Sequence, residues 1–174
     1  MKTWIAAFAA AFVLFSAATA EACLPPPPPP PEQGESEEAY GARVAAWQAA
    51  QDAEAARWRA ERQTRLWDEA DSVILARIER VRPFETAMFG TSQRVTLRGI
   101  RTLKGRRYTN RFTLNYTDGT SCGPLPAFDA ITGNVGDTFV IFIRGGRPNQ
   151  SRVQGTAAPS AVTDERIRAL LAAG

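Results

Sequence analysis

The spacing of apolar residues changes near residue 71, from a helical period before it to a strand period after it. Residues 37–68 are rich in Ala, Glu, Arg and Gln, contain no proline, and are expected to form one helix. Ser36 is a suitable N-cap for this helix. One apolar face, spanning about 60° at 100° per residue, is formed by Tyr40, Val44, Trp47 and Trp58. We expect this face to pack against the chain's own barrel; the alternative is a helix that binds a partner.

From residue 72 onward, short apolar or alternating segments are separated by glycine, proline and aspartate, which is typical of strands joined by turns. Pro83 is expected to end the first strand, and Gly99 to mark a bulge in the second. A C-terminal helix is expected over Asp164–Ala172, with Thr163 as its cap. The expected strands are Ser72–Val81, Gln93–Lys104, Arg111–Thr117, Thr138–Ile143 and Ser151–Gln154.

Five short strands with glycine-marked bends and flanking helices favour a closed barrel over a sandwich, which would normally contain more strands. The expected fold class is therefore mainly β: a five-stranded OB-type β-barrel with a long N-terminal helix and a short C-terminal helix. The sequence divides into residues 1–20, a proline-rich linker over 21–35, the helical segment 36–69, and an OB-like barrel with its helix over 70–174.

The first twenty residues have the features of a secretory signal. Lys2 provides a positive start, and an apolar run follows to Ala18. Two cleavage positions are open: after Ala18-Thr19-Ala20, which leaves Glu21 first, or after Ala20-Glu21-Ala22, which leaves Cys23 first. The apolar run is short for a membrane span. We expect an exported protein, periplasmic or secreted, in which the prolines Pro25–Pro31 form a stiff polyproline spacer.

The chain contains two cysteines, Cys23 and Cys122, both after the expected signal. In an oxidising compartment, two cysteines allow a single intramolecular disulfide. That bond would close a loop of about 100 residues and stabilise the fold by about 4–5 kcal/mol in the chain-entropy model. The alternative is an envelope lipoprotein acylated on Cys23, although Glu21 fits poorly before an acylated cysteine.

Charge is distributed unevenly along the chain. Residues 23–70 hold 9 acidic and 5 basic residues, a balance of −4, whereas residues 71–174 hold 8 acidic and 15 basic residues, a balance of +7. Tyr108 and Phe112 interleave with the basic residues, as in OB-folds that bind charged polymers. Export argues against nucleic acid, which leaves an anionic envelope polymer, an acidic partner, or a solvated arginine-rich hairpin. The candidate basic surface is Arg94, Arg98, Arg101, Lys104, Arg106, Arg107 and Arg111.

Residue types that commonly carry catalysis are scarce. The sequence has no histidine, which removes the commonest general base and the commonest metal ligand. Asp118, Asp129 and Asp137 lie in sequences where aspartate is expected for turn formation. We therefore expect a protein that is not an enzyme and that needs no metal or other cofactor.

Three sequence segments resemble the tissue inhibitors of metalloproteinases and the related netrin-like modules, in their bacterial form. They are the strand sequence at residues 70–77, Thr120-Ser121-Cys122-Gly123, and the apolar strand that follows Gly136-Asp137. The resemblance implies an OB-type barrel and a disulfide from Cys23 to Cys122. It also implies that a target protease would contact Cys23, Leu24, Ser121 and Cys122.

This chain departs from the inhibitors in three ways. About thirty extra residues, in the proline-rich segment and the helix, stand between Cys23 and the first strand. The inhibitors begin Cys-x-Cys and carry several disulfides, whereas here Leu24 and Pro25 follow Cys23. Zinc chelation in the inhibitors also requires the first cysteine to be residue one, which cleavage after Ala20 would prevent. The sequence therefore favours an exported, non-catalytic module that binds another protein, with protease inhibition as a special case. The alternative is the lipoprotein, with a structural or anionic-polymer-binding role.

Overall fold

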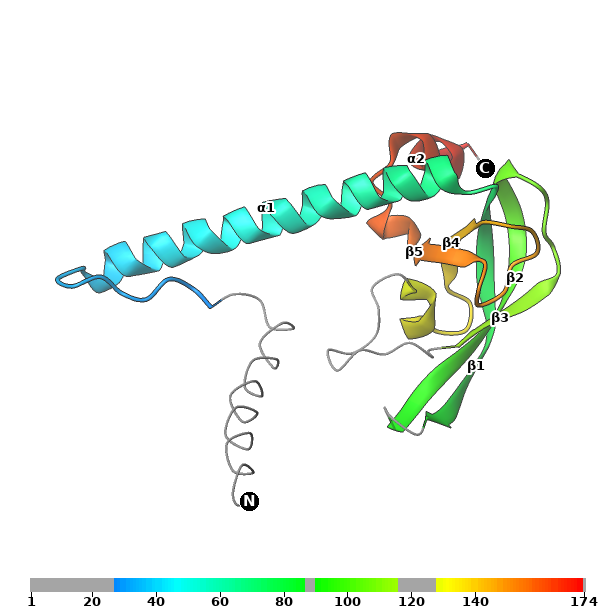
Figure 1. Ribbon diagram of the computed structural model, residues 1–174, viewed down its shortest axis with the longest axis horizontal. Coiled ribbons are helices and arrows are strands. Elements are labelled where there is room, and N and C mark those ends of the chain that lie inside the picture. The colour runs from blue at the N-terminus through cyan, green and yellow to red at the C-terminus, as the bar shows by residue number, and fades with distance from the viewer. Residues whose placement is uncertain (1–26, 87–89, 116–127, 174) are drawn as a thin grey trace, which may run out of the picture.

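The computed structural model describes residues 27–86, 90–115 and 128–173 (Figure 1). A long helix, α1 (Glu37–Glu69), precedes an antiparallel sheet of five strands. Two short 3-10 turns, η1 (Asp129–Thr132) and η2 (Pro159–Ala161), and a C-terminal helix, α2 (Glu165–Ala172), complete the described chain. The strands are β1 (Ser72–Thr86), β2 (Gly90–Gly105), β3 (Arg111–Asn115), β4 (Thr138–Ile143) and β5 (Val153–Ala157).

The sheet has the order β3-β2-β1-β4-β5, with β1 at its centre. The register of β1 and β2 shifts where Leu75 pairs with Arg101 and Ala76 pairs with Gly99, so the expected bulge beside Gly99 is confirmed. The prediction of a mainly β fold with a long and a short helix is also confirmed. Strand pairing in the described residues gives an open sheet between the edges β3 and β5.

Both faces of the sheet bury apolar side chains, and β4 contributes to each. Phe139, Ile141 and Ile143 point into one core, together with Ile74, Val95, Leu97 and Leu114 from the other strands. Val140 and Phe142 point into a second core on the opposite face, which α1 and α2 cover through Leu66, Trp67 and Ile167. The continuous apolar run over residues 138–143 is therefore buried on both faces, as the sequence predicts.

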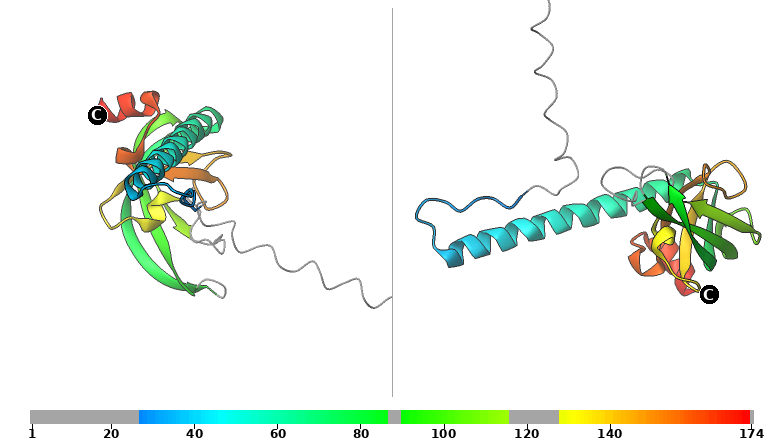
Figure 2. Two further views of the ribbon diagram at one scale, coloured as in Figure 1. Left: turned by 90° about the vertical axis from the view of Figure 1, so that its left-hand side faces the viewer. Right: turned by 90° about the horizontal axis from the view of Figure 1, so that it is seen from below.

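Pro83 does not end the first strand, contrary to the prediction. β1 continues to Thr86 and pairs with β2 throughout, with Pro83 opposite Gln93. On its other side, β1 pairs with β4 only as far as Arg77. Ile78 still bonds to the backbone of Gly136 and Asp137 on that side. Beyond Ile78, β1 has an open edge, where proline's missing N–H removes no ladder bond. The result is a β1–β2 hairpin that extends past the rest of the sheet (Figures 1 and 2).

Other boundaries differ by a few residues. β2 begins at Gly90, before the predicted start at Gln93. β5 is Val153–Ala157, and it ends three residues after the predicted end at Gln154. β3 ends at Asn115 within the described residues. At the C-terminus, Asp164 rather than Thr163 caps the helix, because its carboxylate accepts hydrogen bonds from Arg166 N and Ile167 N.

α1 is a continuous 33-residue helix, about 50 Å long at 1.5 Å per residue. Ser36 caps it as expected, its hydroxyl accepting a hydrogen bond from Ala39 N at 3.2 Å. The last turns lie on the sheet, whereas the first half projects away from it (Figures 1 and 2). α1 is therefore attached to the sheet through its C-terminal end, and we call its projecting first half the arm.

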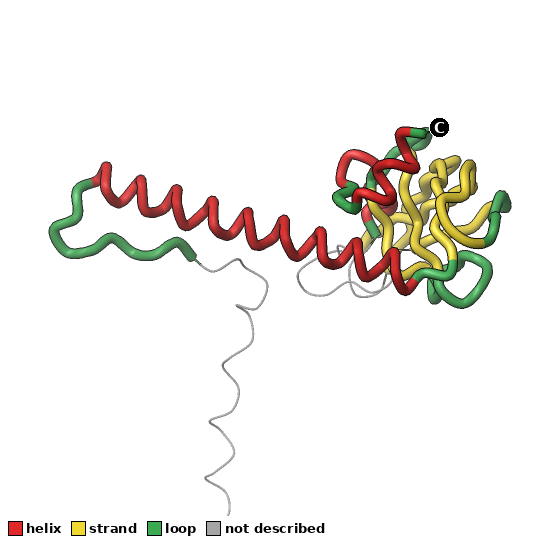
Figure 3. The backbone as a smooth tube through the Cα atoms, turned by 90° about the horizontal axis from the view of Figure 1, so that it is seen from above, coloured by secondary structure: helices red, strands yellow, loops and turns green. Residues whose placement is uncertain are grey.

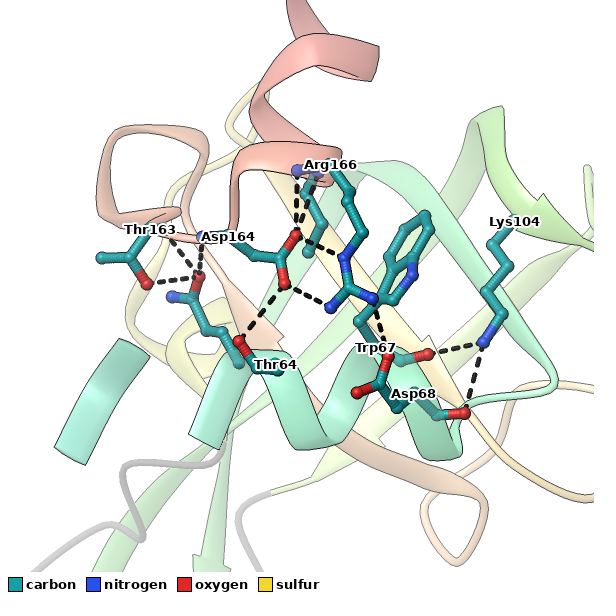
Figure 4. Close-up of polar contacts among 9 residues, drawn as sticks. Thr64, Trp67, Asp68, Lys104, Thr163, Asp164 and Arg166 are labelled. Carbon is teal, nitrogen blue, oxygen red and sulfur yellow. Dashed lines mark hydrogen bonds and ion pairs between the residues drawn. The ribbon is translucent and has the colours of Figure 1, made fainter. Parts of the chain in front are cut away.

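The attachment of α1 is a polar network around Gln63, which is 7% exposed (Figure 4). Its amide nitrogen donates to Ala161 O at 2.7 Å, and its amide oxygen accepts from Thr163 N at 2.7 Å. Arg166 joins Asp164 and Asp68, at 2.7 Å from each, and stacks on Trp67. These bonds tie the end of α1 to the start of α2.

The proline-rich segment folds back on α1 instead of extending from it as a spacer. A turn at residues 32–35 reverses the chain, and residues 27–31 lie beside the first half of the helix (Figure 3). Arg43 holds this arrangement by donating to Pro30 O at 2.9 Å and to both carboxylate oxygens of Glu35. That pairing lowers the pKa of the Glu35 carboxyl to about 2.

Candidate functional site

Six arginines share one face of the β1–β2–β3 part of the sheet. On each strand they alternate with residues of the first core, such as Ile78 on β1 and Leu97 on β2, so they point away from that core. α1 and α2 cover this side of the sheet over its other end, but not here (Figure 1). We call this surface the arginine face; it consists of Arg77, Arg80, Arg82, Arg94, Arg98 and Arg111.

The strand register places arginines directly opposite one another. Arg77 pairs with Arg98, and Arg82 pairs with Arg94, across β1 and β2. Arg98 also pairs with Arg111 across β2 and β3. Like charges directly opposite each other destabilise a sheet. Three such pairs on one face are an arrangement that folding alone does not favour.

One carboxylate partly neutralises the arginine face. Glu79 lies within 3.5 Å of Arg98 and forms a close ion pair with Arg111, whose hydrogen bond lowers the pKa of the Glu79 carboxyl. Arg94 stacks on the Phe84 ring at 5.2 Å and donates to Asn115 Oδ1 at 2.8 Å. In the described part of the chain, no ion pair involves Arg77, Arg80 or Arg82. Against six arginines, Glu79 leaves a formal excess of five positive charges on this face.

The basic residues named from the sequence do not all meet on one surface. Arg94, Arg98 and Arg111 lie on the arginine face. Arg101 instead donates to Leu171 O in α2 at 3.3 Å, and Lys104 donates to Trp67 O at the end of α1 at 2.6 Å. Arg106 stacks on Tyr108, and Arg107 is exposed in the same loop. Arg101 and Lys104 therefore bind main-chain carbonyls of α2 and α1 and attach these helices to β2.

The other named site residues, Cys23, Leu24, Ser121 and Cys122, lie outside the described residues. This holds for both ends of the expected disulfide and for the expected protease contact.

A groove of about 530 Å³ lies between the second half of α1 and the sheet. Leu66 contributes apolar surface above the buried Phe142 and Ala157, and Trp58, which is 49% exposed, stands at its side. Gln51, Glu54, Ala55, Arg59 and Arg62 continue its lining on α1, and Asp129, Thr156 and Ala161 on the opposite wall. Its size is that of a ligand site.

Two opposite charges face this groove in half-buried positions. Burial raises the pKa of the Asp129 carboxyl, with Arg62 opposing the rise, and burial lowers the pKa of the Arg62 guanidinium. Among the described residues, no salt bridge joins the two side chains. Each charge is thus partly desolvated without an ion pair among the described residues, and such perturbed charges are common at functional sites.

Asp129→Asn is expected to stabilise the protein at neutral pH. Because burial raises the pKa of Asp129 in the folded state, the unfolded chain ionises first as pH rises, and stability falls through that window. The asparagine variant lacks this loss. Thermal unfolding at pH 7 and at pH 3 would show its advantage at pH 7 only. Asp52→Asn on the exposed arm is the control, and a variant less stable than wild type at pH 7 would contradict the expectation.

Comparison with models of protein families and with curated proteins gives no match to this chain. Within residues 27–86, 90–115 and 128–173, no helix combines the length and apolarity that crossing a membrane requires.

Reasoning from sequence missed half of the arginine face. Arg77, Arg80 and Arg82 lie in or just after the segment assigned to the first strand, and the alternation of Ala76, Ile78 and Val81 with them was the available signal. The signal was obscured because Glu79 adds a residue at the register shift between Ile78 and Arg80. Because the first strand is predicted to stop before Pro83, the pairing of Arg82 with Arg94 does not follow from the sequence.

Proposed function

We propose that the protein is an exported, non-catalytic binding module that takes an acidic partner protein on the arginine face. The observation that carries the proposal is the three directly opposed arginine pairs on a part of the sheet that α1 and α2 do not cover. Their mutual repulsion is relieved when carboxylates lie between them. An anionic partner therefore supplies the negative charge that the arginine face lacks.

The kind of cation supports a carboxylate-bearing partner. All six cations of the face are arginines, whose planar guanidinium matches a carboxylate through two parallel hydrogen bonds. Glu79 is an example within the chain of one carboxylate held between two of these arginines, since it contacts Arg98 and Arg111 together. Arginine is also enriched at protein interfaces, where lysine is depleted. Acidic side chains of a partner would extend the Glu79 arrangement to Arg77, Arg80 and Arg82.

We further propose that the sheet is an OB-type barrel of the inhibitor-like or netrin-like kind. The order β3-β2-β1-β4-β5 would close into a ring if β3 met β5. Two contacts support that approach: Asn115 N, at the end of β3, donates to the Gln150 side chain at 2.6 Å, and Phe128 bridges to Thr156 of β5. In this fold, the outer face of strands 2 and 3 is the usual ligand surface.

Binding of two polyanions tests the class of partner. Poly-L-glutamate and polyphosphate of matched charge would be titrated into the protein by calorimetry at several salt concentrations. We expect poly-L-glutamate to bind more tightly, with affinity that falls as salt rises. Tighter binding of polyphosphate would favour the envelope-polymer alternative, and binding of neither would contradict the proposal.

The proposed module also has the Cys23–Cys122 disulfide. The fold-back at residues 32–35 supports it, because residues 27–31 run along α1 toward the sheet instead of away from it (Figure 3). Intact-mass analysis of the exported protein is expected to show no lipid and a mass two protons below that of the reduced chain. A mass that includes acyl chains on Cys23 would exclude the disulfide and favour the lipoprotein.

A further inference from the structure

The side of α1 that carries the apolar face continues into the groove. Tyr40, Val44 and Trp47 are followed at helical spacing by two apolar and two polar residues that line the groove between α1 and the sheet: Ala55, Trp58, Gln51 and Arg62. The face predicted to pack on the sheet therefore has two halves. Its first half lies on the projecting arm, and its second half forms one wall of the groove.

The first half of this face already holds a polyproline segment. Residues 27–31 lie beside it, and Tyr40, Val44 and Trp47 are half-buried there although the sheet does not reach them (Figures 1 and 3). Arg43 stacks on the Tyr40 ring at 5.5 Å and donates to the Pro30 carbonyl. A polyproline helix makes no internal hydrogen bonds, so its carbonyls accept bonds from such a donor.

The second half repeats the same unit without a partner among the described residues. Arg62 stacks on the Trp58 ring at 5.9 Å, as Arg43 stacks on Tyr40. Trp58 is 49% exposed, although it is a large aromatic side chain beside an apolar groove. Gln51 and Arg59 add further side-chain donors along the same wall.

We propose that this groove binds an extended, proline-rich peptide segment of a partner protein, one that carries an acidic side chain. The peptide would lie along α1 as residues 27–31 do, with a proline ring on Trp58 and a second apolar contact at Leu66, which is partly exposed in the groove. Aromatic grooves bind polyproline peptides at low entropic cost, because the peptide is already extended.

The charges of the groove set the second requirement. Arg59 and Arg62 stand beside Trp58, and both can donate to a carboxylate or to a peptide carbonyl. Asp129 faces Arg62 from the opposite wall, half-buried. Glu54 also lines the groove, on the other side of Trp58 around the helix from Arg59 and Arg62. A peptide carboxylate at the Arg59 side would meet positive charge and avoid both Asp129 and Glu54. The site is distinct from the arginine face, so either proposal can fail without the other.

A labelled peptide tests the proposal on the full chain. The probe is fluorescein-labelled hexaproline ending in glutamate, compared with a glycine-serine peptide of equal length and charge. Fluorescence polarisation is expected to show saturable binding of the proline probe. Trp58→Ala is expected to weaken this binding about tenfold or more, since a central aromatic is the usual hot spot. Arg62→Gln is expected to weaken it as well, and Trp58→Phe to weaken it less than Trp58→Ala.

Arg57→Gln is the matched control, because Arg57 is on the same helix, is 72% exposed and does not line the groove. It is expected to leave binding of the probe unchanged. Circular dichroism would establish that each variant retains its helix. Failure of the proline probe to bind, equal binding of the glycine-serine peptide, or full affinity in Trp58→Ala would each overturn the proposal.

Discussion

Gly99→Ala is expected to destabilise the protein by about 3 kcal/mol or more. A Cβ at residue 99 would overlap the backbone carbonyl of Tyr108 and approach Ile74 Cδ1 to 3.3 Å. Backbone cannot move aside as a flexible side chain can, and Tyr108 packs against the first core. Relieving the overlap would therefore shift the connection between β2 and β3 or the bulge that sets the β1–β2 register.

Chemical denaturation of the variant would measure this loss as a lower denaturant midpoint. Gly41→Ala is the matched control, because nothing lies within 4 Å of the added methyl group and the residue is inside α1. There the substitution is expected to favour the helix by about 0.5–1 kcal/mol. A Gly99 variant as stable as the Gly41 variant would contradict the close approach of Tyr108.

Gln63→Ala is expected to cost about 2–3 kcal/mol, because it leaves buried polar groups unpaired. The Ala161 carbonyl loses its donor, and Thr163 N and Asp164 N lose their acceptor. These groups lie in the segment that leads into α2, so removing the Gln63 amide weakens the attachment of α1 to α2 (Figure 4). Hydrogen exchange of the α2 amides is expected to accelerate together with the fall in unfolding free energy.

Gln48→Ala is the control for this prediction. Gln48 is on the same helix, but it is exposed and bonds Asp52 on the helix surface at 3.2 Å. Its loss is expected to change stability by no more than about 0.5 kcal/mol. Equal effects of the two substitutions would mean that Gln63 does not anchor α1.

The elements with strong periodicity could be predicted from sequence, and those set by a neighbouring strand could not. The bounds of β4 are as predicted, because an apolar run between Gly136-Asp137 and Gly145-Gly146 permits little else. Gly99 was recognisable as a bulge from its place in an alternating strand. The prediction that Pro83 ends the first strand is wrong. A proline fits inside a strand where that strand has no second neighbour, and whether β1 has one at Pro83 is a property of the whole sheet.

The apolar face of α1 is predicted correctly from the sequence, but the segment that covers its first half is not. Tyr40, Val44 and Trp47 lie beside the proline-rich segment, because Arg43 binds both Glu35 and Pro30 O. A contact thirteen residues away across a turn leaves no periodic signal. Likewise, Gln63 looks like an ordinary helix glutamine, and its partners, a hundred residues later, are fixed by the packing of α1 on the sheet.

The proposed binding of acidic partners is tested most directly by removing the same charge from two surfaces. One variant replaces Arg77, Arg80 and Arg82 with glutamine, and the other replaces Arg57, Arg147 and Arg168, which are exposed elsewhere. We expect the first to bind poly-L-glutamate about tenfold to a hundredfold more weakly than wild type. Its stability should not fall, because like-charge pairs are removed.

The second variant is expected to bind poly-L-glutamate nearly as tightly as wild type. Equal weakening in both variants would mean that net charge alone attracts the polymer. Unchanged binding in the first variant would contradict the assignment of the arginine face as the binding surface.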